Sequence, residues 1–211
     1  MLLIDPQPRT SRQLPLENLT TDARNRFLRE DPDDPSLLPV NDNVVRQKAQ
    51  AITAEAVSDA ERVQLIFKYC TQIDSKQEAA SDSVKDALTL GTGTPLARAR
   101  TMVTLCRSLK IPARLVTGFF IQQGTDVQPL VWVEVFLNQA WVPFDPTLGW
   151  SLSLPMEYVP VRRDSDQIVD KGKTANVDKL VAKFAIHRLE PDVSVLQGDV
   201  PHPIQILNLL R

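Results

Sequence analysis

The sequence has few of the residues that most often carry catalytic and metal chemistry. Its 211 residues include two cysteines and two histidines. Cys70 and Cys106 form no metal motif, and two cysteines are too few for a disulfide framework. His187 and His202 both lie near the C-terminus. Because no cluster of His, Asp and Glu has metal-ligand spacing, we expect no metal site and no cofactor.

An excess of basic charge is also missing. Lys and Arg number 24 against 26 Asp and Glu, giving a net charge of −2, so nucleic acid is not an expected partner. No apolar run approaches the roughly 18 residues of a membrane span. Met1 to Ile4 is followed at once by Asp5, so no signal peptide is predicted. A hydrophobic fraction of 43% and a charged fraction of 24% are ordinary for a globular domain.

The first half of the chain has helical patterns. Residues 1–42 form a proline-rich arm in which only Thr20 to Glu30 has a cap and a helical rhythm. Apolar residues at helical spacing follow from Val45 to Ala56. Ser58 and Glu61 then form a capping box that opens a second helix, and a short helix is expected around Val84 to Leu88.

The best-defined helix follows a glycine-rich turn at Gly91. Thr94 is a good N-cap, and Pro95 suits the first helical position because its missing N–H has no partner there. The predicted buried face holds Leu96, Ala99, Met102, Val103, Cys106 and Leu109. Arg98, Arg100 and Arg107 are expected to point away from it. Cys106 and Cys70 both belong to apolar stripes, which favours inert core cysteines.

After Pro112 the pattern becomes that of strands. Residues 113–122, 130–137 and 140–145 alternate and are rich in Val, Phe and Trp, with Asn138-Gln139 as a tight hairpin turn. Residues 151–178 are mixed and polar, and Lys179 to Leu189 predicts one more strand. Helices followed by an antiparallel sheet indicate an α+β fold. We expect a domain over residues 43–190 and a C-terminal extension over 191–211.

Three motifs carry a family resemblance. Residues 111–114 (IPAR), 132–135 (WVEV) and 141–146 (WVPFDP) occur in the order and spacing of the transglutaminase-like superfamily, relatives of papain-type thiol proteases. The resemblance covers about residues 43–150. It implies a papain-type core with helices packed on an antiparallel sheet. Among family members, the chain is most similar to inactive domains that some bacterial membrane proteins carry before seven transmembrane helices.

In active relatives the pattern implies a Cys at the helix start, a His before the WVEV stretch and an Asp in the DP pair. Carried over to this sequence, these places fall on Pro95, Leu130 and Asp145. Proline has no nucleophile and leucine cannot accept a proton, so the expectation is that the chain is not an enzyme. Asp145 is then expected to cap a turn. Thr94, at the same helix start, has no evident activating base.

The leading functional hypothesis is therefore a catalytically inactive module that binds a peptide or a partner protein. Through the resemblance it is expected to be sensory and to lie outside the cytoplasm as part of a membrane protein. The candidate cleft residues are Thr94, Phe119, Trp132 and Trp141. One alternative is an active hydrolase or acyl-transferase that uses displaced catalytic residues. The other is a structural spacer with a filled cleft.

Overall fold

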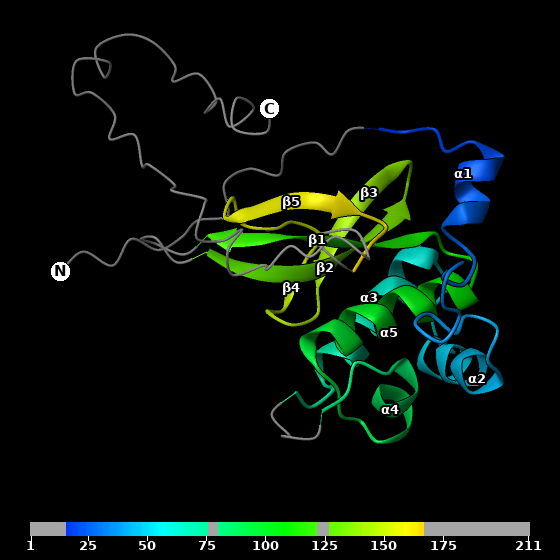
Figure 1. Ribbon diagram of the computed structural model, residues 1–211. Helices are drawn as coiled ribbons and strands as arrows, with labels where there is room; N and C mark the ends of the chain where they lie inside the picture. Colours follow the sequence, from blue (N-terminus) through cyan, green and yellow to red (C-terminus); the bar gives the residue numbers. More distant parts are fainter. Residues whose placement is uncertain (1–15, 76–79, 122–126, 167–211) are drawn as a thin grey trace, which may run out of the picture.

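Helices cover one face of a five-stranded antiparallel sheet in the computed structural model, which describes residues 16–75, 80–121 and 127–166 (Figure 1). The strand order is β4-β3-β2-β1-β5. The predicted α+β fold is confirmed. The helices, in chain order, are α1 (Thr21–Arg26), α2 (Asn43–Ile52), α3 (Asp59–Thr71), α4 (Val84–Thr89) and α5 (Pro95–Ser108). The predicted strand at 179–189, His187, His202 and the expected extension 191–211 lie outside the described residues.

Side-chain caps determine where the helices begin. Thr20, Asp42, Ser58, Ser83 and Thr94 each accept a hydrogen bond from a backbone N–H of the first turn of the helix that follows. The predicted capping box at Ser58 forms in part: Glu61 N–H donates to the Ser58 hydroxyl, but the Glu61 carboxylate accepts from Val57 N–H. The predicted helix at Thr20 begins as expected and ends at Arg26, four residues earlier than Glu30.

The sheet grows mainly through hairpins. Each of the first three strands, β1 (Ala113–Ile121), β2 (Val127–Leu137) and β3 (Ala140–Asp145), pairs with the next one along the chain. The short β4 (Trp150–Ser151) pairs with the outer edge of β3. Asn138 and Gln139 have φ angles of 48° and 64°, the left-handed pair that a two-residue hairpin turn requires. β5 (Tyr158–Arg163) returns to pair with β1. It was not predicted, because Pro160 and the adjacent charged residues Arg162 and Arg163 obscure its alternation.

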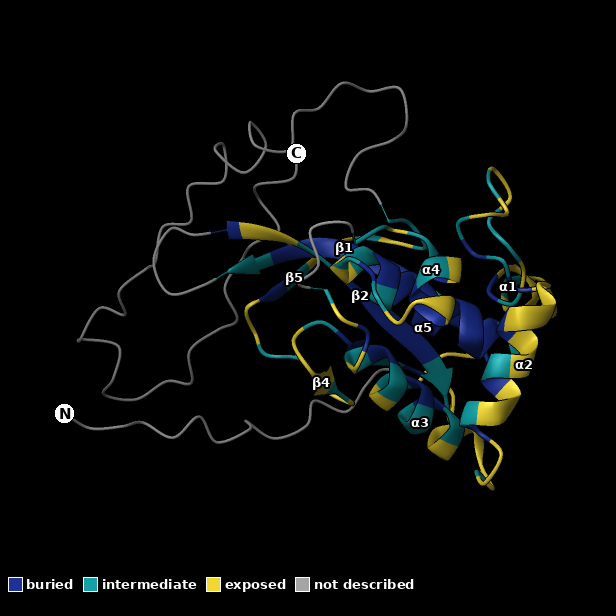
Figure 2. Ribbon diagram, turned by 90° about the horizontal axis from the view of Figure 1, so that it is seen from below, coloured by how far each residue is buried: buried dark blue, intermediate teal, exposed yellow. Residues whose placement is uncertain are grey.

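The central helix α5 has almost no solvent-exposed face. It contacts α2, α3, α4, β1 and β2, and Figure 2 shows it in dark blue beside the buried strands while α2 and α3 carry the exposed residues. The prediction that Arg100 and Arg107 point to solvent is therefore wrong. Arg107 is 3% exposed and donates to the carbonyls of Ala113 and Arg29 and to the Asp164 carboxylate. Burial lowers the pKa of Arg107, and Asp164 opposes that shift.

Two apolar clusters lie on opposite sides of the sheet. The larger joins the helices to one face of β1 and β2. The smaller, on the other face, consists of Val116, Trp132 and Tyr158 with partly buried neighbours that include Phe120 and Leu130. Among the described residues, no helix is long and apolar enough to cross a membrane. The helices and the sheet together bring the N-terminus of α5 close to the first half of β2.

Candidate functional site

A groove of about 690 Å³ opens beside the N-terminus of α5. Pro95 and Leu130, the positions to which the motif resemblance assigns the family's Cys and His, both line it. Its walls are mainly apolar and come from α5, β2, the end of β1 and the turn between β3 and β4. The lining residues are Asp82, Thr94, Pro95, Leu96, Phe120, Gln128, Pro129, Leu130, Val131, Thr147, Leu148 and Trp150.

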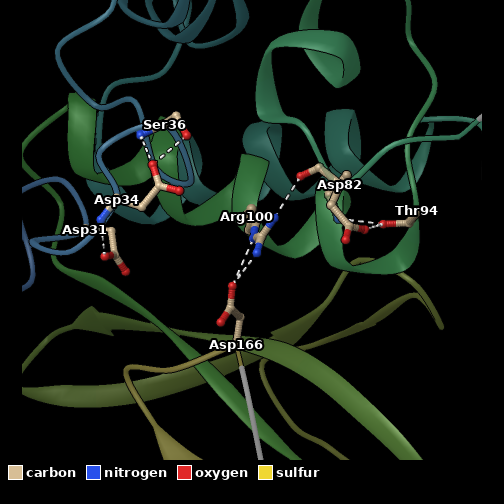
Figure 3. A network of polar contacts seen from close by, with 8 residues as sticks. Asp31, Asp34, Ser36, Asp82, Thr94, Arg100 and Asp166 are labelled. Atoms are coloured by element: carbon tan, nitrogen blue, oxygen red, sulfur yellow. Dashed lines mark hydrogen bonds and ion pairs between the residues drawn. The ribbon is translucent and has the colours of Figure 1, made fainter. Parts of the chain in front are cut away.

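Thr94 is held at the groove by two hydrogen bonds. Its hydroxyl accepts from Ala97 N–H at 3.2 Å, which caps α5, and donates to the Asp82 carboxylate (Figure 3). The backbone N–H of Thr94 donates to the carbonyl of Ser81 at 3.0 Å, so the segment before α4 is fixed against the start of α5. The sequence showed no base near Thr94. Asp82 escaped notice because it lies twelve residues earlier in a polar stretch without periodicity.

Asp145 lies at the end of β3 with no exposed surface. One carboxylate oxygen accepts from the backbone N–H groups of Thr147 at 2.7 Å and Leu148 at 3.1 Å. The other accepts from the Tyr158 hydroxyl at 2.6 Å. The predicted role of Asp145 as a turn cap is confirmed. Burial, together with the Asp145 carboxylate, raises the pKa of Tyr158, so the phenol stays a proton donor.

Arg98 ties α5 to the same turn. Its guanidinium donates to the carbonyl of Ile73 and, at 3.4 Å, to the carbonyl of Pro146. The turn that follows Asp145 is thus held by Tyr158 on one side and by Arg98 on the other. It presents two apolar side chains at the groove, Leu148 at 50% exposure and Trp150 at 45%. Neither residue was identified from the sequence, because turn residues after a strand have no hydrophobic period.

The other predicted cleft residues lie elsewhere. Phe119 and Trp132 are buried in the sheet, and the Trp132 ring meets Tyr158 edge-on at 5.5 Å between centroids. Trp141 packs edge-on against Phe27 at 4.9 Å, and the Arg114 guanidinium lies 3.8 Å from the centre of its ring. These three side chains do not line the groove, whereas Thr94 does. The expected aromatic cleft wall is instead supplied by Trp150 and Phe120.

Neither cysteine thiol lines the groove. Cys70 and Cys106 are free and fully buried. Burial raises the pKa of the Cys70 thiol well above its ordinary value and that of Cys106 to about 12. The prediction that both cysteines are core residues is confirmed, and their inertness stays a prediction. No group of three or more metal-ligating side chains exists within the part of the chain that the structure describes.

A second cavity, of about 540 Å³, borders α5 at Arg100 and Arg107 and is lined mostly by charged residues. Its walls carry both signs of charge, and the chain's own ion pairs occupy much of them. Arg100 pairs with Asp166 and donates to the carbonyl of Asp82 (Figure 3). Arg107 and Arg26 share the carboxylate of Asp164. This network connects the end of β5 to α5 and, through Asp82, to the groove.

Comparison with known proteins identifies the fold. Residues 46–146 match the family model of the transglutaminase-like superfamily. A solved structure from Cytophaga hutchinsonii, named a "Putative Cysteine Protease", is 20% identical, with a TM-score of 0.55 over 69% of this chain and 48% of its own. The periplasmic domain of TgpA from Pseudomonas aeruginosa is also 20% identical, with a TM-score of 0.47 over 61% of this chain and 48% of its own. No curated protein sequence matches.

These comparisons correct one expectation. The prediction that the chain is not an enzyme is wrong, because the matched superfamily is generally enzymatic and a structure of the same fold is named as a protease. The prediction failed because it considered three positions only. Pro95 and Leu130 carry neither a thiol nor an imidazole, but the groove holds other polar groups, such as Thr94 and Asp82. The chain spans about half the length of these two structures.

Proposed function

Because residues 46–146 match the family model of the transglutaminase-like superfamily, we propose that the groove beside α5 binds an extended segment of polypeptide. The observation that carries the proposal is the groove's composition. Pro95, Leu96, Leu130, Leu148 and Trp150 surround a space of about 690 Å³, a volume typical of ligand sites. Trp150 and Leu148 remain half-exposed although the core beside them is well packed. Aromatic side chains at such a rim are common anchors for peptides.

The test is a direct binding measurement. A random decapeptide display library is selected against the full chain, and the best binders are synthesised and titrated by fluorescence anisotropy. Trp150→Ala and Leu148→Ala are each expected to weaken binding by at least tenfold. Val44→Ala, on α2 with 43% exposure and outside the groove lining, is the matched control and should leave affinity unchanged. If no peptide binds, or if Trp150→Ala binds as well as the parent chain, the proposal is refuted.

The expectation that the domain is a sensory, extracytoplasmic part of a membrane protein stays a proposal of the same kind. The resemblance of the motifs around Gly91 and Trp132 supports it. In a host cell, fractionation of the endogenous protein with antibodies against this domain would test it. Recovery from the cytoplasmic fraction alone would contradict it.

A second function, acyl transfer or hydrolysis, is favoured by the hydrogen bond from the Thr94 hydroxyl to the Asp82 carboxylate inside the groove. In such a reaction the Thr94 oxygen attacks a bound carbonyl while Asp82 takes the hydroxyl proton. Asp82 then returns the proton to the leaving group, and water cleaves the resulting ester. The helix N-terminus favours the negative charge that develops nearby.

This function is tested with p-nitrophenyl acetate and intact-mass spectrometry. An acetylated chain, with the added mass on Thr94, is expected. Asp82→Asn keeps the cap at Thr94 but removes the base, so it should abolish acetylation, whereas Thr94→Ser should retain it. Acetylation that persists in Thr94→Val would show that the hydroxyl is not the nucleophile.

A further inference from the structure

The first half of β2 has an open edge on the side of the groove. All of β1 pairs with β2, where its partners run from Val127 to Val135. On the opposite side β3 pairs only with residues from Val133 to Leu137. N-terminal to Val133, no strand among the described residues pairs with that side of β2. Residues 128–131 of this edge line the groove.

The strand register shows which backbone groups face the opening. Pro143 lies opposite Glu134 and has no N–H, so this pair cannot exchange both hydrogen bonds. The bonds from β2 to β3 therefore come from odd-numbered residues such as Val133. The N–H of Phe136 donates to the carbonyl of Pro112, which shows that even-numbered residues bond on the side of β1. Backbone groups alternate along a strand, so Val131 directs its N–H and its C=O toward the groove.

Proline limits the length of this edge. Pro129 is the next residue whose backbone faces the groove, and it offers a carbonyl but no N–H. Val131 is thus the residue that can both donate to and accept from an added strand, and Pro129 can accept alone. Unpaired edges of this kind recruit extended chains, and a proline restricts where such pairing occurs.

We propose that the groove holds its polypeptide as an added β-strand, hydrogen-bonded to the N–H and C=O of Val131 and ending at Pro129. This inference rests on the proposed peptide-binding function and adds its mode of recognition. The side chains on one face of the added strand meet Leu130 and Phe120, and those on the other meet Pro95 and Leu96. The occupant is therefore an extended segment with apolar side chains on both faces.

Charge complementarity narrows the occupant further. Asp82 is the charged residue among those that line the groove. One of its oxygens accepts from Thr94, which leaves the other for a ligand. A lysine or arginine near the end of the segment that lies against α5 gains a charge-assisted hydrogen bond there. The segment therefore combines apolar residues with one basic residue.

The test scans the peptide backbone. The best peptide from the decapeptide selection is synthesised with a single N-methyl group at each position in turn, which removes one N–H at a time. Methylation at one or two alternate positions is expected to weaken binding by at least tenfold, with the intervening positions unaffected. Val131→Pro should weaken binding of the unmethylated peptide to a similar degree. Val131→Ala keeps the N–H and should change the affinity for that peptide less than threefold.

The basic residue is tested in the same assay. Replacement of the peptide's lysine or arginine by glutamate should weaken binding by at least fivefold, and Asp82→Asn should remove most of that difference. A difference that persists in Asp82→Asn would refute the charge assignment.

The outcomes separate the inference from the function beneath it. If every N-methyl peptide binds like the parent while Trp150→Ala still abolishes binding, the groove binds peptides but strand addition is refuted. If no peptide is selected, the peptide-binding function and the strand addition are both refuted. A dimer of the chain that Val131→Pro dissociates and that excludes the peptide would assign the edge to a second copy and overturn the choice of occupant. Because the N-methyl scan uses the unaltered chain, the test survives even if Val131→Pro fails to fold.

Discussion

Replacing Tyr158 with phenylalanine removes one oxygen and leaves the aromatic ring in place. The ring packs edge-on against Trp132 and Phe120, with centroids 5.5 and 5.2 Å away, and that packing is kept. The change deletes the hydrogen bond from the Tyr158 hydroxyl to the buried Asp145 carboxylate, 2.6 Å long. A hydrogen bond to a charged group contributes about 1.5–3 kcal/mol. We expect the free energy of unfolding to fall by about 2 kcal/mol, because the carboxylate keeps its two backbone donors but loses the third.

The assay is urea unfolding followed by fluorescence, with the slope of the transition compared between variants. Tyr69→Phe is the matched control. Tyr69 is half-buried on α3, packs against Lys48 and has no hydrogen bond from its hydroxyl among the described residues. The control should change stability by less than about 0.5 kcal/mol. Equal stabilities for the two variants would refute the argument that the Asp145–Tyr158 bond holds the turn. Asp145→Asn, combined with Tyr158→Phe, then measures the coupling between the two side chains.

Three further results are expected. Gly118→Ala should destabilise the fold by at least about 2 kcal/mol, because a Cβ there would lie 2.1 Å from the carbonyl oxygen of Val159. Gly149→Ala should cost only about 1 kcal/mol, because a Cβ at that position meets open space and only the φ of 80° opposes it. Equal costs in thermal unfolding would contradict this order. Arg107→Met should cost about 3–5 kcal/mol, since it removes a buried cation and leaves its three acceptors without that donor. Arg62→Met, from an exposed pair with Asp59, should cost less than about 1 kcal/mol. Similar urea midpoints for the two variants would contradict the larger cost expected for Arg107→Met. At pH 8, below the raised pKa values of both buried thiols, iodoacetamide should label Cys70 and Cys106 only after unfolding; rapid native labelling, mapped by mass spectrometry, would refute their assignment as core residues.

The sequence predicted the helices and the three central strands because local signals were strong there. Thr94 and Pro95 form a helix start through contacts within the first turn, and Asn138-Gln139 supplies the turn that a hairpin needs. Contacts between segments that are distant in the chain left weaker signals in the sequence. The burial of Arg107 depends on carbonyls contributed by Arg29 and Ala113, which lie on segments distant in the chain or beyond the helix end. An amphipathic pattern treats every charged residue as outward-facing, so it fails where a helix is enclosed on all sides.

The candidate site was predicted in part for a similar reason. The family motifs located Pro95 and Leu130 correctly at one place in the fold, because the spacing of motifs along the chain is retained when residues change. The groove's rim was missed. Leu148 and Trp150 line the groove because Asp145 holds their turn and Tyr158 in turn holds Asp145. Tyr158 lies in the stretch 151–178, whose mixed and polar composition predicts no such contact. Such long-range pairs leave no periodic signal in a single sequence.

The enclosure of α5 has a consequence for genetic screens of this domain. Ten of its fourteen residues are buried, while its first turn forms one wall of the groove. A substitution in the helix body will therefore lower the amount of folded protein before it alters recognition, and the two effects will look alike in a phenotype. Leu148 and Trp150 are about half exposed and line the groove. A library confined to these two positions would report mainly on recognition, with the abundance of the protein as an internal check.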